Sequence, residues 1–148
     1  YTAKGVYMWR DLARICAAQG LPLKKPSQFP RGSLLAARIA CRFADEAWVG
    51  EFVRRVYSAN FVEDADISSP FVIGKILSDM GQVPAPMLHA AQAQETKNAF
   101  RAQAERAVAL GIIGAPSFVV DGEVFWGGDR LQQALDWACG KRAVVSGV

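Results

Sequence analysis

The chain has 148 residues, of which 51% are hydrophobic and 21% are charged, and its formal net charge is +3. This length suits one domain, or one domain that carries an insertion. No apolar run is long enough to span a bilayer, and the scattered basic residues form no stripe of the kind that binds nucleic acid. We therefore expect neither a membrane partner nor a nucleic-acid partner.

The cysteines and the histidine limit the possible chemistry. Cys16, Cys41 and Cys139 form no C-x-x-C pair and no metal-ligand spacing, and each lies in a helical apolar pattern. We expect buried, unreactive thiols. His89, the single histidine, supports neither a histidine-based triad nor a histidine-rich metal site. Because the reducing cytosol is the natural compartment for such cysteines, the expected location is cytoplasmic.

Apolar residues at three- and four-residue steps predict that most of the chain is helical. Helices are predicted over residues 6–16, 34–48, 47–57, 70–80, 84–94 and 96–108. Pro22 helps to stop the first helix, Ser33 is the expected cap of the second, and Pro70 follows the cap Ser69 at a first helical position. Residues 21–32 are a proline-rich connection, and residues 59–67 are predicted to be a loop.

The hydrophobic period changes at Gly111. The segments SFVV and EVFW flank Asp121-Gly122, whose residues both tolerate positive φ, and this pattern predicts a β-hairpin. A last helix is predicted around Leu135. Because a two-stranded hairpin is marginal by itself, we expect a strand–helix–strand unit upstream of Tyr1, so that this chain begins inside its fold.

Two features of the hairpin suggest a ligand site. A cis bond before Pro116 would turn the backbone of Ala115 outward, where an extended peptide could add as a strand. Trp126–Asp129 includes two glycines that let a ligand approach closely, and free N–H groups at a helix start favour a carboxylate. Asp129 either caps the helix or accepts a ligand ammonium. A plain hairpin followed by a capped helix explains the same residues, whereas glutathione would satisfy both places.

The segment GIIGAPSFVVDGEVFWGGDRL resembles the C-terminal half of the DsbA-like thioredoxin fold in the group of 2-hydroxychromene-2-carboxylate isomerases and kappa-class glutathione transferases. KGVYMWRDLARICAAQGLPLKKPSQFPRGSLLAARIA and VYSANFVEDADISSP resemble the helical insertion of that group, in the same order. The resemblance implies an α/β, thioredoxin-like fold with an all-helical insertion, and a cytosolic homodimer that uses glutathione. It implies a helical insertion with its leading helix over 1–94, the C-terminal thioredoxin-like half over 95–142, and a tail over 143–148.

The resemblance also implies the residues of the site. Ala115, beside a cis Pro116, would pair its backbone with the cysteinyl part of glutathione. The γ-glutamyl end would be held by Trp126, Gly127, Gly128 and Asp129. The serine that stabilises the thiolate in this family lies upstream of the part matched by Tyr1, so no catalytic residue and no metal ligand is expected within the chain. Gly32 stands where many relatives carry a polar side chain, which leaves Arg31, with Arg38, as a candidate contact for a substrate carboxylate.

The expected activity is that of a glutathione-dependent cis–trans isomerase of the 2-hydroxychromene-2-carboxylate isomerase type. Its substrate would be an aromatic or conjugated keto acid, to which the glutathione thiolate adds reversibly so that the former double bond can rotate. A kappa-like glutathione transferase or peroxidase and a DsbA-like thiol–disulfide oxidoreductase remain open as other enzymes. A helical binding module without catalysis is the alternative outside the enzymes.

Overall fold

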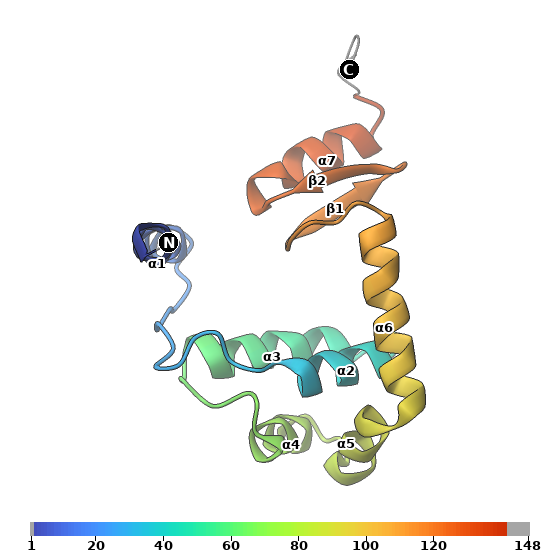
Figure 1. Cartoon of the computed structure of the whole chain (residues 1–148). Helices are drawn as coiled ribbons and strands as arrows, with labels where there is room; N and C mark the ends of the chain where they lie inside the picture. Colours follow the sequence, from blue (N-terminus) through green and yellow to red (C-terminus); the bar gives the residue numbers. More distant parts are fainter. Residues whose placement is uncertain (1, 142–148) are drawn as a thin grey trace. The chain divides into compact units, whose positions relative to one another are not determined.

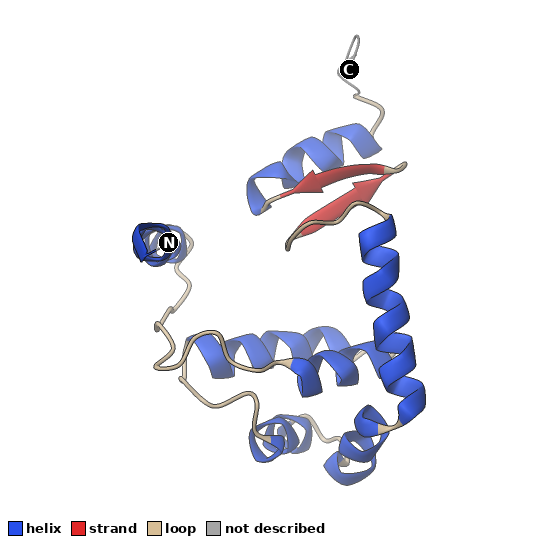
Figure 2. Ribbon diagram, viewed as in Figure 1, coloured by secondary structure: helices blue, strands red, loops and turns tan. Residues whose placement is uncertain are grey.

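The computed structural model describes residues 2–141, which contain helices and one β-hairpin (Figures 1 and 2). The helices are α1 (Thr2–Ala18), α2 (Leu34–Arg42), α3 (Val49–Phe61), α4 (Pro70–Asp79), α5 (Pro84–Gln92), α6 (Gln94–Ala109) and α7 (Leu131–Ala138). The strands are β1 (Ser117–Val120) and β2 (Glu123–Trp126), and a short 3-10 turn, η1, covers Gly128–Arg130. The chain divides into two compact units between Ala99 and Phe100. The predicted tail, 143–148, lies outside the described residues.

Helices α2 to α5 enclose the core of the first unit. Each helix turns an apolar stripe inward, as an amphipathic helix does. Ile39 of α2, Phe52 of α3 and Leu77 of α4 are almost completely inaccessible to solvent. The other buried apolar residues of this core are Ala36, Val56, Ala59, Ile67, Ile73, Ile76 and Ala91.

Helix α1 belongs to the same unit but buries none of its residues. It contacts the following loop through Trp9, whose ring meets Phe29 edge-on with the ring centroids 5.0 Å apart. The Nζ of Lys25 lies 5.7 Å from the centroid of the Trp9 ring. Val6 and Tyr7 are exposed apolar side chains on this helix.

The helix ends differ from the predicted ones where tertiary contacts decide them. α2 ends at Arg42 rather than at Trp48, and the turn that follows packs Phe43 against Trp48 with the ring centroids 5.5 Å apart. α3 continues to Phe61, so the loop predicted from Ala59 onward starts later, because Ala59 and the residue after it are buried.

Two further expectations are corrected near helix ends. Ser33 and Ser69 precede α2 and α4 as predicted, but neither side chain makes a capping hydrogen bond. Cys139 is exposed, and Cys16 and Cys41 are half-buried, so these thiols are not fully buried. Cys139 follows Ala138, the last residue of α7.

The second unit contains the predicted hairpin with α7 packed on it. β1 and β2 are antiparallel, with Ser117 opposite Trp126. Asp121 and Gly122 have φ values of 51° and 86°, as the Asp-Gly turn requires. Phe125 is buried, and its ring meets Trp137 of α7 with the centroids 5.9 Å apart. None of the helices within residues 2–141 is both long enough and apolar enough to cross a membrane.

Candidate functional site

The start of β1 presents an unused piece of backbone. The Ala115–Pro116 peptide bond is cis, as the sequence hypothesis requires. Ala115 is exposed, and neither its N–H nor its C=O pairs with another residue in the described part of the chain. The hydroxyl of Ser117 donates to the carbonyl of Gly114 at 2.6 Å and holds the turn before the strand. Both polar backbone groups of Ala115 are therefore available to an extended peptide.

A hydrogen bond joins this edge to the second half of the predicted site. The N–H of Gly127 donates to the carbonyl of Pro116 at 3.0 Å. Gly127 also has a φ of 122°, which side-chain-bearing residues rarely adopt. Its amide is already used, so it is not one of the free N–H groups that were expected at the helix start. The same bond places the residues after β2 next to the residues before β1.

Gly128 and Asp129 supply the free N–H groups instead. Both residues are exposed, and their amides have no hydrogen-bond partner within residues 2–141. The side chain of Asp129 is 77% exposed, and its Oδ2 lies 3.7 Å from Nε of Arg130. It makes no capping bond to η1 or α7, which removes one of its two predicted roles. Asp129 thus offers a ligand both an amide and a carboxylate.

The Trp126 ring lies against Gly114, a residue that was not expected to belong to the site. A Cβ on Gly114 would lie 2.5 Å from Nε1 and 2.9 Å from Cε2 of the Trp126 indole. The ring therefore occupies the space that any side chain at position 114 would need, while Trp126 itself is 55% exposed. In the sequence, the feature that pointed to this contact was Gly114 itself, two residues before Pro116.

The geometry matches the two ends of a short peptide with an amino-acid head. The backbone of Ala115 can pair with a peptide unit, and the amides of Gly128 and Asp129 can hold a carboxylate. The carboxylate of Asp129 can accept from an ammonium. In the described part of the chain, no group of three or more His, Cys, Asp or Glu residues could hold a metal ion.

Arg31 lies in the helical unit and has a different environment. Its side chain is 5% exposed. Nη1 donates to Oδ1 of Asn60 and to the carbonyl of Ala65, both at 3.1 Å. Nη2 donates to Oγ of Ser27 at 3.1 Å and pairs with Asp64. The terminal N–H groups of Arg31 are thus used by acceptors within the chain, so a direct contact with a substrate carboxylate stays a prediction.

Asp64 is the acidic centre of this network. The backbone N–H of Ser27 donates to its Oδ1 at 2.9 Å, and Nζ of Lys24 lies 3.6 Å from Oδ2. The bond from the Ser27 backbone, followed by the bond from Arg31, holds the pKa of the Asp64 carboxyl well below its ordinary value. The network fastens the loop before α2 to the loop after α3.

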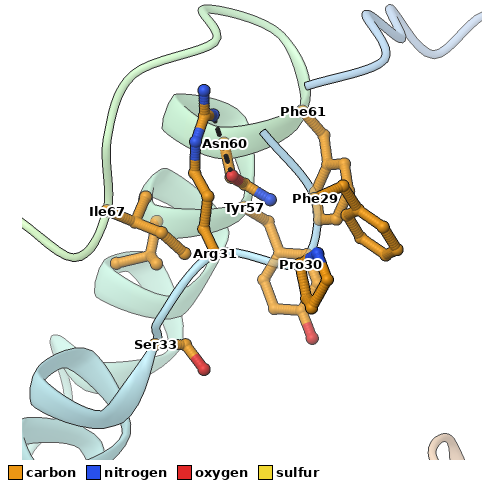
Figure 3. A pocket seen from close by; sticks show the side chains of 9 residues that line it. Phe29, Pro30, Arg31, Ser33, Tyr57, Asn60, Phe61 and Ile67 are labelled. Carbon is orange, nitrogen blue, oxygen red and sulfur yellow. Dashed lines mark hydrogen bonds between the residues drawn. The ribbon is translucent and has the colours of Figure 1, made fainter. Parts of the chain in front are cut away.

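Arg31 also forms part of a pocket of about 230 Å³ (Figure 3). Phe29, Tyr57 and Phe61 give this pocket its aromatic character, and Asn60 contributes an amide. The sequence pattern did not predict this group, because the end of α3, from Ala59 to Phe61, was expected to lie in a loop. Asn60, a polar residue at the end of an apolar helical pattern, was the sequence feature that pointed to this pocket.

Arg38, the second basic candidate, is separate from this pocket. It lines another hollow of about 340 Å³ together with Gly32 and Lys97. Its guanidinium makes no hydrogen bond or ion pair with the residues that the structure describes, and its Nε is buried. Arg31 and Arg38 therefore line different hollows of the helical unit.

Comparison with known proteins assigns the family. The model of the DsbA-like thioredoxin domain matches residues 1–136. The chain belongs to the DsbA-like thioredoxin domain family. This membership confirms the predicted DsbA-like, thioredoxin-like fold, which is mostly helical in this chain.

Relatives of this DsbA-like chain include isomerases. A 2-hydroxychromene-2-carboxylate isomerase from Sphingobium xenophagum is 27% identical over 124 residues, which cover 84% of this chain and 63% of that protein. The chain thus spans less than two thirds of the length of that relative.

Two solved structures have a similar fold. A 2-hydroxychromene-2-carboxylate isomerase matches with a TM-score of 0.77 and 22% identity, over 95% of this chain and 68% of that one. A putative protein disulfide isomerase from Nitrosomonas europaea matches with a TM-score of 0.70 and 19% identity, over 97% and 77% of the two chains.

Proposed function

We propose that this DsbA-like protein is a glutathione-dependent isomerase of the 2-hydroxychromene-2-carboxylate isomerase type, acting on an aromatic or conjugated keto acid. One observation carries the glutathione assignment: the free backbone edge at Ala115 is tied, through the Gly127–Pro116 hydrogen bond, to the free amides of Gly128 and Asp129. The similarity to the Sphingobium xenophagum isomerase supports the type of reaction.

The residues of the hairpin divide the work of binding. Ala115 holds the cysteinyl backbone through its N–H and C=O. The amides of Gly128 and Asp129 receive the γ-glutamyl carboxylate, and the Asp129 carboxylate receives the ammonium. Trp126, seated on Gly114, covers one side of the bound peptide. When bound, glutathione supplies the nucleophilic thiolate, and the orientation set by these residues is what the chain contributes.

The setting of the protein is part of the same proposal. The partner is a small aromatic or keto-acid substrate, and the protein works as a cytoplasmic homodimer without membrane or nucleic-acid partners. Three cysteines with no C-x-x-C pair support the reducing compartment. No catalytic residue is assigned within Tyr1–Val148, in line with the family resemblance.

An NMR titration of the full chain with reduced glutathione tests the binding site. We expect the amide signals of Ala115, Gly128 and Asp129 to shift. Cysteinylglycine, which lacks the γ-glutamyl group, should retain the shift at Ala115 and lose those at Gly128 and Asp129. Asp129→Ala should weaken glutathione binding about tenfold or more, because it removes a charge-assisted hydrogen bond.

Glu123→Ala provides the matched control, since Glu123 is an exposed carboxylate of β2 outside the site. It should bind glutathione like the unsubstituted chain. Equal affinities for Asp129→Ala and the unsubstituted chain, or shifts that avoid Ala115 and Gly128, would refute the assignment.

A kappa-like transferase would use the same glutathione site, so the reaction itself must be tested. An isomerase leaves the concentration of free thiol unchanged while its substrate converts, whereas a transferase consumes one thiol per product. We expect conversion of a conjugated aryl keto acid without loss of thiol. Consumption of thiol in proportion to product would replace the isomerase with the transferase.

A further inference from the structure

The pocket beside Arg31 is lined by none of the residues assigned to glutathione. It lies between the loop that carries Phe29 and the last turns of α3 (Figure 3), and its volume is about 230 Å³. An apolar protein cavity of about 150 Å³ is sufficient to hold benzene. This pocket therefore has room for one substituted aromatic ring or a fused pair of rings.

Its lining suits a flat apolar ring. Tyr57 and Phe61 stack with their ring centroids 5.9 Å apart and their planes at 27°. Val56 and Ile67 line the pocket as buried aliphatic side chains, whereas Phe29 and Tyr57 are 49% and 62% exposed. A lining that combines buried aliphatic side chains with exposed aromatic ones forms an apolar site that a ligand can enter from solvent.

Asn60 brings a buried polar group to this lining. The residue is 5% exposed, and its Oδ1 accepts from Nη1 of Arg31 at 3.1 Å. Because a guanidinium only donates, this bond determines which atom of the amide faces Arg31. The Nδ2 atom consequently points to the side on which Tyr57 and Phe29 lie (Figure 3), where no described residue accepts from it.

Arg31 fixes this orientation and is itself immobilised. Its other terminal donors are held by Asp64, Ser27 and the carbonyl of Ala65. The Asp64 carboxylate compensates its charge, so Arg31 is not a free cation for a ligand. Nδ2 of Asn60 has no acceptor among the described residues, so a ligand that supplies one gains a hydrogen bond within a largely apolar pocket.

We infer that this pocket binds an aromatic compound whose carbonyl or carboxylate oxygen accepts a hydrogen bond from Nδ2 of Asn60, with Arg31 as the positioning residue for that amide. The inference rests on the proposed function only in calling this ligand the substrate. The pocket makes Asn60 the residue that selects an aromatic ring bearing an oxygen acceptor over a plain hydrocarbon ring.

Titration of the full chain with three probes, without glutathione, tests the inference by NMR. Acetophenone carries a ring and a neutral carbonyl, benzoate carries a ring and a carboxylate, and ethylbenzene carries no oxygen. We expect all three to shift the ring signals of Tyr57. Acetophenone or benzoate should also shift the side-chain amide signals of Asn60, and the stronger of the two identifies the preferred acceptor.

Substitutions separate the ring contact from the hydrogen bond. Asn60→Leu should weaken the binding of the better oxygen-bearing probe about three- to tenfold and leave ethylbenzene unaffected. Tyr57→Ala should weaken all three probes. Phe71→Ala removes an aromatic side chain of α4 that is 80% exposed and lies outside the pocket, so it should change none of them.

Arg31→Lys tests the positioning role, because lysine keeps the charge but cannot hold several acceptors in one plane. It should weaken the oxygen-bearing probe more than ethylbenzene. An equal loss for both would mean that Arg31 is only structural and would overturn its assigned role.

Two results would overturn the site as a whole. One is the absence of any shift at Tyr57. The other is an equal shift of the Asn60 amide by ethylbenzene and by the oxygen-bearing probes, a comparison that needs no variant and so does not depend on how Asn60→Leu folds. These titrations contain no glutathione, so a failure of the site at Gly128 leaves them unchanged, and a failure here leaves the glutathione shifts unchanged.

Discussion

Gly114 shows how the absence of one Cβ positions a side chain of the candidate site. The Trp126 indole lies where that atom would be, so the ring cannot keep its place if position 114 carries a side chain. Gly128, by contrast, has open space around the position of its missing Cβ and no positive φ. An alanine methyl group would therefore collide with the Trp126 ring at position 114 but would meet no atom at position 128.

We expect Gly114→Ala to lower the free energy of unfolding by about 1–3 kcal/mol, the usual cost of overpacking. Urea unfolding followed by tryptophan fluorescence measures this change and reports the displaced indole. As a control for stability, Gly128→Ala should change the free energy of unfolding by less than about 0.5 kcal/mol. Similar losses for both variants would show that Trp126 does not depend on Gly114.

Arg31 shows what a single residue reveals about the limits of sequence reasoning. Its place next to Gly32, in the predicted helical insertion, suggested a contact for a substrate carboxylate. Its side-chain acceptors, however, include Asn60 and Asp64, which lie 29 and 33 residues after Arg31 in the chain. Since no local pattern encodes such distant partners, the sequence identified an important residue without showing which groups it holds.

At the scale of elements, Asp64 determines how two loops meet. It accepts from the backbone and the hydroxyl of Ser27 at 2.9 and 3.0 Å, and it pairs with Arg31. Its own φ of 59° is in the left-handed region, where aspartate is among the residues best tolerated. The loop before α2 and the loop after α3 therefore share one ionised carboxylate.

We expect the contacts of Asp64 to make the stability of the folded state depend on pH in the acidic range. The pKa of Asp64 is lowered from an ordinary value of 3.8, chiefly by the Ser27 backbone N–H and then by Arg31. A lowered pKa in the folded state stabilises that state at pH values above 3.8, and the contribution is lost as the pH falls further, toward the pKa of the folded state. The Tm should therefore decline between about pH 5 and pH 2.

Asp64→Asn should lower the Tm at pH 7 and flatten its decline in acid. Asp79→Asn is the matched control, because Asp79 forms an exposed ion pair with Lys75 on α4, and such pairs contribute little. Thermal unfolding by circular dichroism across this pH range measures both. An acid decline of unchanged steepness in Asp64→Asn would assign the pH dependence to other carboxylates.

The elements that the sequence predicted well have local causes. Pro70 begins α4, and Asp121-Gly122 forms the turn of the hairpin. Both could be predicted because each depends on the φ preference of only one or two residues. The ends of α2 and α3 were predicted less well. There, Trp48 and Asn60 respond to packing and hydrogen bonds from other segments, which override helix propensity.

At the scale of the molecule, burial is unevenly distributed. In the first unit it is concentrated in α2 to α5, while α1 buries none of its residues. Opening a helix without buried side chains exposes little apolar surface, so its free energy of opening is small. The stability of α1 is therefore expected to be low in comparison with that of the core.

Hydrogen exchange followed by mass spectrometry tests this difference. We expect the amides of α1 to exchange at least roughly a hundredfold faster than those around Ile39, Phe52 and Leu77, a difference of about 3 kcal/mol in opening free energy. If the proposed homodimer covers α1, its protection should increase with protein concentration. Protection equal to that of the core at every concentration would contradict the prediction.

The sequence by itself determined the features whose causes are near in the chain: the hairpin, the helix starts at proline, and the motifs that place the chain in the DsbA-like thioredoxin domain family. Only the tertiary structure showed that the Gly127 amide is used by Pro116, and that Arg31 turns the amide of Asn60 toward an aromatic pocket. Both depend on contacts between segments that are apart in sequence. Periodicity and turn chemistry describe the conformation of one segment, whereas the partner of a buried polar group is decided by which segments the fold brings together.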